Sequence, residues 1–150
     1  MKTISIKTLE DLQKLDLNNF TVTEDIEIHI SLKIIDKKVN YPIVIKHNQP
    51  DLVSNIKIKA ALYGNSELIM PVEIIVNHGA KNTKTGFNAI VYILSSEARA
   101  RITPGLFIHE KEILGAGHGL IIKNIKDRDT VYLESRGIQK SEAREMIVNL

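Results

Sequence analysis

The pattern of hydrophobic and polar positions changes from a helical to an extended period early in the chain. Leu9, Leu12 and Leu15 recur at helical spacing behind the capping residue Thr8, which predicts a short helix near 9–15. After this helix, apolar and polar residues alternate in short segments for about 100 residues, as in half-buried strands. The expected strands are near 20–35, 43–45, 56–62, 68–76, 89–94, 106–108 and 120–122, separated by polar turns and loops such as 36–40, 64–65 and 77–86.

The succession of short strands determines the expected fold class. Because no helix-length pattern separates the strands, the sequence predicts an all-β fold: a sandwich, a barrel or a stacked solenoid. No fixed repeat period stands out. Pro71 is expected at a strand start, a bulge or an edge, since it has no amide hydrogen to donate. Strands such as 68–76 or 89–94, if exposed at an end of a solenoid, would pair with a second copy, so we expect a dimer.

After Asn124 the pattern becomes helical. Asp127 can cap a first helix, Arg136 lies in its last turn, and Gly137 suits the position just after its end. A second helix is expected from about Lys140, with an apolar face made by Ala143, Met146, Ile147 and Leu150. Packing explains such a face more simply than partner binding. The chain therefore divides into a β core over 1–124 and a helical segment over 125–150.

Composition narrows the possible functions. Hydrophobic residues make up 43% of the chain, aromatic ones only 5%, and Trp is absent, so Ile, Val and Leu must fill the interior. The net charge is +2 with both signs mixed along the chain, which favours neither a nucleic-acid partner nor a membrane surface. Cys is absent, so disulfides and thiolate ligands are excluded. Residues 1–7 lack an apolar segment, so we expect no signal peptide and a cytoplasmic location.

Among the five histidines, His118 is the best candidate for chemistry. Flanked by Gly117 and Gly119, its imidazole is expected to be accessible, and a neutral imidazole can bind iron. The alternative is a histidine beside a turn with no function. His78 and His109 are weaker candidates. No pair has metal-site spacing, and the glycines around His118 lack the GK[ST] of a phosphate-binding loop, so neither a preformed zinc site nor nucleotide binding is predicted.

Two acidic residues near the end of the β region suggest a different function. Glu110 and Glu112 alternate, so both could face one side of a strand and form the carboxylate pair of a carbohydrate-active β-helix enzyme. The simpler interpretation is a solvated pair of charges.

Arg136 could form an ion pair with Asp129 or Glu142, or contact a partner protein.

Several stretches occur in an order typical of one family. They are VNHGAKNTKT at 76–85, YILSSEARA at 92–100, ITPGLFI at 102–108, HG at 118–119 and YLESRGI at 132–138. The last four resemble the LLLS-x-x-A-x, TIPQLEI, SHGA and FYLRSRGI segments in the core of the SufB and SufD proteins of the Suf iron–sulfur cluster assembly machinery, and the first resembles a loop of that core. The resemblance covers roughly residues 55–150.

The resemblance implies a right-handed parallel β-helix followed by a small helical segment. It implies a scaffold subunit, not an enzyme, that forms a homodimer or a heterodimer with a SufB- or SufD-like protein. It also implies that the C-terminal helices bind a SufC-like ABC-type ATPase, with Tyr132, Arg136, Met146 and Ile147 as candidate contacts. His118 would be the residue nearest to any transient iron–sulfur cluster.

Two departures from the family pattern qualify that expectation. The cluster-building subunit of the family uses a Cys as sulfur acceptor and has a Glu directly after its histidine, whereas this chain has Gly119 there and no Cys. The His118-Gly119 pair therefore resembles the SufD type. The chain is also shorter than ordinary members. A β-solenoid assembly module that holds no cluster remains the alternative.

Overall fold

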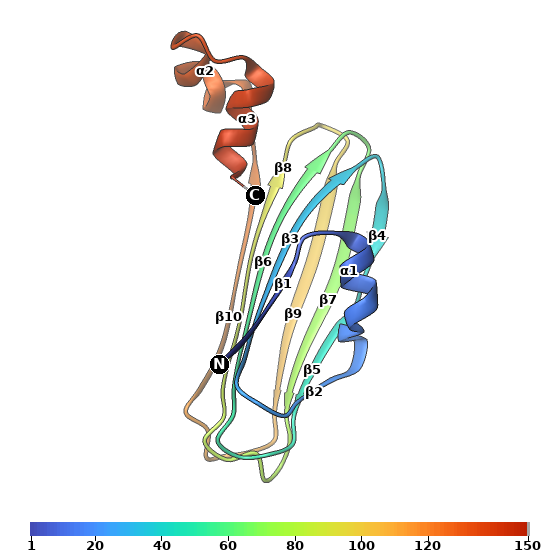
Figure 1. The fold of residues 1–150 in the computed structure, drawn as a ribbon, viewed down its shortest axis with the longest axis vertical. Coiled ribbons are helices and arrows are strands. Elements are labelled where there is room, and N and C mark those ends of the chain that lie inside the picture. The colour runs from blue at the N-terminus through green and yellow to red at the C-terminus, as the bar shows by residue number, and fades with distance from the viewer. Residues whose placement is uncertain (150) are drawn as a thin grey trace.

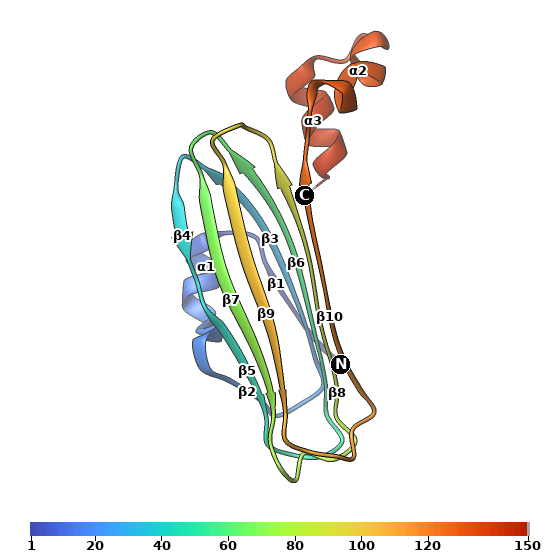
Figure 2. The same ribbon diagram turned by 180° about the vertical axis from the view of Figure 1, so that it is seen from behind.

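The computed structural model describes residues 1–149, and this part of the chain is a parallel β-helix of about three turns with a few short helices (Figures 1 and 2). This architecture confirms the β-solenoid expected from the sequence. Sheet A contains, in spatial order, β1 (Lys2–Ile6), β3 (Ile26–Ile35), β6 (Val53–Tyr63), β8 (Lys84–Ile93) and β10 (Gly115–Asn124). Sheet B contains β2 (Phe20–Val22), β5 (Ile43–His47), β7 (Glu67–Val76) and β9 (Arg99–Ile108), with β4 (Lys38–Asn40) also paired to β7.

The period-two alternation places one side of every long strand in the interior. In sheet A, Ile28 lies beside Ile56, Ile56 beside Phe87, and Phe87 beside His118 on the edge strand. The first three side chains are fully buried. In neighbouring parallel strands, the residues that pair with each other point to the same side of the sheet. Inward apolar side chains therefore stack in rows along the solenoid axis. These rows form the core.

The repeat that the sequence hides is visible in the strand register. Lys84 pairs with Val53 and Gly115 pairs with Lys84, an offset of 31 residues in both cases. The offset between β3 and β6 is shorter, since Ile26 pairs with Ser54. Stacking requires only that inward positions be apolar and of compatible size, so the repeat leaves no fixed sequence motif.

Pro71 lies inside β7, opposite a break in the neighbouring strand. β4 pairs with β7 up to Ile69, and β5 pairs with it again from Val72. Pro71 falls between these two segments, where a missing amide hydrogen removes no ladder bond on that side. The break in the neighbour replaces the bulge or edge that we expected.

The N-terminal end of the solenoid is closed by α1 (Leu9–Leu15) and the following 3₁₀ turn (Leu17–Asn19). Leu12 and Leu17 are buried in this cap. The Tyr41 hydroxyl donates to the Leu12 carbonyl at 2.8 Å and accepts from the Leu17 amide at 2.9 Å. Burial raises the pKa of Tyr41, so this clamp stays protonated at neutral pH.

The C-terminal end is open. Within residues 1–149, β10 pairs only with β8, and β9 pairs within its sheet only with β7. This corrects the expectation that 68–76 or 89–94 supplies an exposed edge. β7 lies between β5 and β9, and β8 lies between β6 and β10, so both strands have parallel neighbours on each side.

The helices α2 (Asp127–Ser135) and α3 (Lys140–Val148) follow β10, and α3 packs against the solenoid. Apolar side chains of α3, of the solenoid and of the segment after β10 form a second small core: Ala61, Tyr63, Tyr92, Leu94, Ile125, Ile147 and Val148. Glu145 accepts hydrogen bonds from Lys33 at 2.8 Å and from the Tyr63 hydroxyl at 2.9 Å. These contacts attach α3 to sheet A.

The start of α2 differs from the prediction by one residue. Lys126, not Asp127, is the N-cap, and the Asp129 carboxylate accepts from the Lys126 amide at 2.7 Å. Gly137 has a φ of 87°, which confirms its predicted role after the helix. Leu150, expected on the apolar face of α3, lies outside the described residues. No helix within residues 1–149 has the length and hydrophobicity needed to cross a membrane.

Phe87 is the largest fully buried side chain, and we expect its removal to be costly. Phe87→Ala should reduce the free energy of unfolding by about 3–5 kcal/mol, because a cavity would replace the aromatic ring. Phe107→Ala is the matched control: that ring is 46% exposed, so the loss should stay below about 1 kcal/mol. Urea unfolding at one fixed protein concentration measures both. Equal losses would contradict this description of the core.

Candidate functional site at the open end

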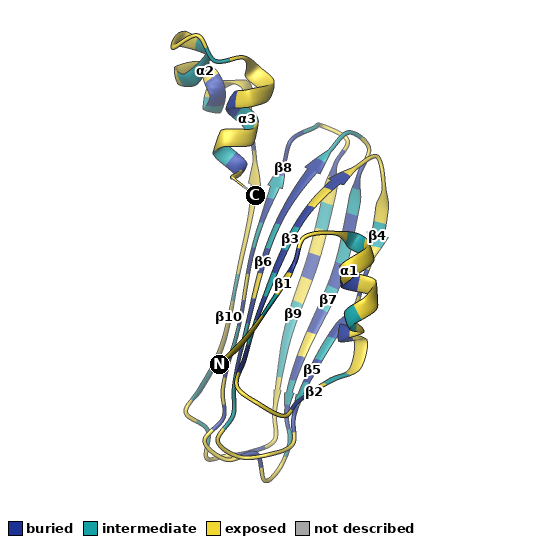
Figure 3. Ribbon diagram, viewed as in Figure 1, coloured by how far each residue is buried: buried dark blue, intermediate teal, exposed yellow. Residues whose placement is uncertain are grey.

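The inward side of β10 is uncovered and mostly apolar. Register with β8 puts Ala116, His118, Leu120 and Ile122 on the side that faces the solenoid interior. Since no further turn stacks on them, Leu120 and Ile122 are 36% and 43% exposed. On the opposite sheet, Ile108 at the end of β9 is 37% exposed. Figure 3 shows β10 largely exposed, whereas the inward residues of β8 are buried.

His118 lies within this strand and not in a turn, which corrects the alternative placement beside a turn. Phe87, which pairs with His118 on the neighbouring strand β8, is fully buried. Gly117 and Gly119 face the outer side of the sheet, so they do not expose the imidazole as we expected. The imidazole is exposed because the solenoid ends at β10.

Gly119 has a separate structural role on the outer face. A Cβ atom at this position would lie 2.8 Å from Oδ1 of Asn88 on the neighbouring strand. The Asn88 side chain therefore occupies the space that a larger residue at 119 would need. Gly117 has no atom within 4 Å of such a Cβ and carries no comparable constraint.

A single copy does not provide a complete metal site. Within residues 1–149, no group of three or more His, Cys, Asp or Glu side chains is arranged to hold a metal ion. His118 could donate one imidazole nitrogen, and the remaining ligands would have to come from another molecule. The open end thus presents a lone ligand on an apolar surface.

The other histidines do not gather around His118. His29 lies on the outer face of sheet A, with Nε2 3.3 Å from a carboxylate oxygen of Glu27. His78 is exposed in the loop after β7, and His109 is exposed at the end of β9. The structure therefore brings neither of the weaker candidates to the His118 site.

His47 is the titratable residue that the sequence reasoning missed. It is fully buried, and its Nε2 shares a hydrogen bond of 2.8 Å with Ser54, whose hydroxyl shares another of 2.8 Å with Thr85. Its Nδ1 has no hydrogen-bond partner within the described residues. Burial lowers the pKa of His47 to about 4, so the imidazole is neutral near pH 7. His47 continues the alternation of Ile43 and Ile45, and this pattern could have predicted that its side chain points inward.

Glu110 and Glu112 do not form the strand-borne carboxylate pair considered above. Both lie in the loop between β9 and β10. Glu110 is buried and accepts backbone hydrogen bonds from Gly79 at 2.7 Å, Lys111 at 3.0 Å and Glu112 at 3.2 Å. These amides lower its pKa, the opposite of what a general acid requires. Glu112 instead pairs with Lys81 at 3.0 Å.

We expect Glu110→Gln to loosen the two loops that Glu110 joins. Because amide donors depress its pKa in the folded state, Glu110 stabilises the protein above the pKa of an unfolded glutamate, and that contribution is lost as pH falls through the lowered pKa. At pH 7 the variant should show faster hydrogen exchange at the Gly79 amide. Glu112→Gln, which removes only an exposed ion pair, should leave that rate unchanged. The same acceleration in both variants would contradict a role for the Glu110 carboxylate in holding the Gly79 amide.

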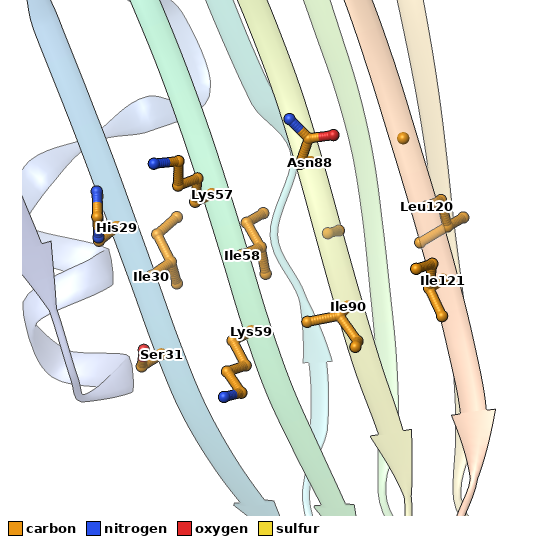
Figure 4. A pocket seen from close by; sticks show the side chains of 12 residues that line it. His29, Ile30, Ser31, Lys57, Ile58, Lys59, Asn88, Ile90, Leu120 and Ile121 are labelled. Atoms are coloured by element: carbon orange, nitrogen blue, oxygen red, sulfur yellow. The ribbon is translucent and has the colours of Figure 1, made fainter. Parts of the chain in front are cut away.

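A groove of about 500 Å³ lies on the outer face of sheet A, lined by residues of β3, β6, β8 and β10 (Figure 4). Ile90 and Ile121 supply its apolar side chains, and Lys57 and Lys59 border it. Lys57 is paired with Glu27 at 2.6 Å, and Lys59 donates to the Asn149 carbonyl at 2.7 Å. The two cations are therefore already engaged, and we assign no ligand to this groove.

The candidate contact residues on the helices differ in accessibility. Tyr132 is 65% exposed and Met146 is 51% exposed. Arg136 lies over the Tyr132 ring, 5.0 Å from its centroid, and forms no ion pair with Asp129 or Glu142 within the described residues. Ile147 is half-buried against the second core, so part of its surface already serves packing.

Comparison with known proteins decides the family. Residues 15–149 match the sequence model described as the SufBD core domain of SUF system FeS cluster assembly. The chain belongs to the SufBD core family. Two relatives described as iron–sulfur cluster assembly SufBD family proteins, from Mycobacterium tuberculosis and Mycobacterium leprae, are 32% and 30% identical over 113 residues. The iron–sulfur cluster assembly protein SufD of Bacillus subtilis is 33% identical over 73 residues.

These SufBD relatives are much longer than this chain. The matches to the two mycobacterial proteins cover 71% of this chain but only 28% and 29% of the relatives. The match to SufD covers 49% of this chain and 16% of that protein. The family match over residues 15–149 includes His118 and the helices α2 and α3.

Proposed function

We propose that this SufBD-family chain is a scaffold subunit of iron–sulfur cluster assembly that joins a second copy through its open end. The observation that supports the proposal most strongly is the asymmetry of the solenoid. Each end of each sheet has an edge strand, but at the N-terminal end the interior is covered by the buried Leu12 and Leu17 of the cap, whereas at the other end β9 and β10 leave inward apolar side chains uncovered. An unprotected strand edge can pair with another chain, and an exposed apolar patch marks an interaction site.

A second copy fits this edge by symmetry. In a two-fold dimer the same patch meets itself, so β10 would run antiparallel to β10 of the other copy and extend sheet A. No charged side chain lies on the inward side of β10, so self-association brings no like charges together there. A SufB- or SufD-like subunit with a similar edge would fit in the same manner.

This arrangement would complete the site around His118. His118 lies near the middle of β10, so an antiparallel pairing would bring two imidazoles to the same side of the joined sheet. Two neutral imidazoles can contribute to binding iron or a cluster in transit. With no cysteine in either copy, sulfide or another protein would supply the remaining ligands, which favours transient holding over stable storage.

The helices α2 and α3 would bind a SufC-like ABC-type ATPase. Tyr132 and Arg136 on α2 and Met146 on α3 are exposed, as is Val131 on α2 at 56%, and Arg136 lies over the Tyr132 ring. Aromatic, Met and Arg side chains are enriched in protein interfaces. In this proposal the chain acts in the cytoplasm and catalyses no reaction of its own. The energy for any movement of the complex comes from the ATPase.

The proposal is tested by co-expressing the chain with the SufC-like ATPase of the same source, followed by anaerobic size-exclusion chromatography and iron analysis. We expect a complex that contains iron. His118→Ala should keep the complex but lose the iron, and His78→Ala is the matched control that should keep both.

Loss of the ATPase from Tyr132→Ala, but not from Lys84→Ala on the solenoid, would support the helical docking surface. A complex without iron in the unmodified chain would favour an assembly module that holds no cluster. Absence of any complex would show that the fold is preserved without the partnership.

A further inference from the structure

A small cavity lies where the helical segment meets the solenoid. It has a volume of about 310 Å³. Three segments line it: the end of β8 with the loop that follows (Ile93, Leu94, Ser95, Ser96), the end of β10 with the start of the next segment (Asn124, Ile125, Lys126), and Arg144 on α3. None of these residues is acidic. The cavity therefore combines an apolar wall with two cations.

Arg144 lacks the partners that a half-buried guanidinium usually has. Its Nε is shielded from solvent and has no hydrogen-bond acceptor within residues 1–149. Buried N–H groups are rarely left unpaired, because their desolvation is then uncompensated. Arg144 also forms no ion pair within 4.0 Å in the described part of the chain, although its charge helps Lys140 to lower the pKa of Asp127.

The other polar groups of the cavity are mostly available as well. Within the described residues, the side chains of Ser96, Asn124 and Lys126 make no hydrogen bond or ion pair, while the Ser95 hydroxyl is engaged with the Gly64 carbonyl and the Ala98 amide. Three acidic residues directly follow lining residues in sequence: Glu97, Asp127 and Glu145. None of the three lines the cavity, Asp127 is paired with Lys140, and Glu145 is paired with Lys33. The available groups are thus two cations, a hydroxyl and an amide, which together suit an oxyanion.

We propose that this cavity binds a phosphate group, either as the free ion or at the end of a small phosphate ester. The guanidinium of Arg144 supplies a planar set of donors that matches phosphate oxygens, and Lys126 adds a second positive charge. The volume accommodates the phosphate and a few attached atoms. Because the lining comes from β8, β10 and α3, the bound group would bridge the solenoid and the helical segment. This inference does not depend on iron binding or on dimerisation.

The test is a titration of the full chain with inorganic phosphate at constant ionic strength, with chloride as the replaced anion. Two-dimensional NMR of the backbone amides follows binding. We expect saturable shifts confined to residues 94–96, 124–126 and the neighbourhood of Arg144. A parallel titration with glycerol phosphate distinguishes the sources: tighter binding than inorganic phosphate would indicate an ester, and weaker binding would indicate the free ion.

Charge variants separate a defined site from general electrostatic attraction. Arg144→Gln should weaken phosphate binding at least tenfold, and Lys126→Gln should weaken it severalfold. Arg128→Gln is the matched control, since it removes the same charge from an exposed position on α2 outside the cavity. If Arg144→Gln does not fold, Arg144→Lys keeps the charge and should still lose several-fold affinity. Shifts scattered over the surface, no saturation, or equal losses in Arg128→Gln and Arg144→Gln would overturn the proposal.

Discussion

Replacing Ile122 by lysine is expected to convert the proposed dimer into a monomer. Ile122 lies on the inward side of β10 and is 43% exposed in a single copy, so the monomer can tolerate a lysine at this position. In the proposed dimer the two-fold axis would bring two lysines onto an apolar surface, with no partner for either charge. We expect the dissociation constant to rise by about 100-fold or more. Analytical ultracentrifugation over a range of concentrations measures it.

Ile35→Lys provides the matched control for this experiment. Ile35 is also an exposed strand isoleucine, at 49%, but it lies on β3, with β6 and β8 between it and the open edge. The control should dimerise like the unmodified chain. If both variants remain dimeric, the copies meet somewhere other than at the inward side of β10.

Acidification from pH 6.5 to pH 4 is expected to remove about 3 kcal/mol of stability through His47 alone. Burial lowers the pKa of His47 to about 4 in the folded state, against an ordinary value of 6.5. Between these values the unfolded chain binds a proton that the folded chain does not, so stability falls as pH falls. Well above pH 6.5 both states are neutral at this residue, and the effect vanishes. Urea unfolding at a series of pH values gives the slope.

His47→Gln isolates this contribution. Glutamine can keep a hydrogen bond to Ser54 but does not titrate, so the variant should be less stable at pH 7 and much less sensitive to pH between 6.5 and 4.5. The carboxylates whose pKa values are lowered, such as Glu110 and Glu145, lose their contribution mainly below this window. An unchanged slope in His47→Gln would mean that another group causes the acid sensitivity.

Local patterns were enough to predict most of the elements, but they missed β1 (Lys2–Ile6) and assigned a turn to 36–40, where β4 (Lys38–Asn40) lies. The leucine spacing behind Thr8 defined α1, and the alternation of Ile26, Ile28 and Ile30 defined β3. The family resemblance and the family match agree on the SufBD core. Within the helical segment, Gly137 ends α2 as predicted. These features depend on neighbours in sequence, so sequence alone carries them.

Features that depend on which strands lie side by side in the folded chain could not be predicted from local sequence patterns. Leu68–Val76 has the composition of a strand that could lie at an edge, but only the stacking of turns decides that β9 and β10 are the uncovered strands. The glycines around His118 suggest a turn, yet pairing with β8 holds them in an extended strand. Glu110 and Glu112 alternate as strand residues do, but the three amides that bind Glu110 hold it in a loop.

Disulfide trapping tests the central claim most directly, since the chain has no cysteine of its own. Single cysteines are introduced at the inward positions Ala116, His118 and Leu120 of β10, at Thr3 on β1 at the closed end, and at Ile35. A disulfide needs Cα atoms within about 7 Å, so mild oxidation reports direct contact between copies. We predict a cross-linked dimer from at least one β10 position and none from Thr3→Cys or Ile35→Cys. Cross-linking only at Thr3, or at no β10 position, would contradict the account.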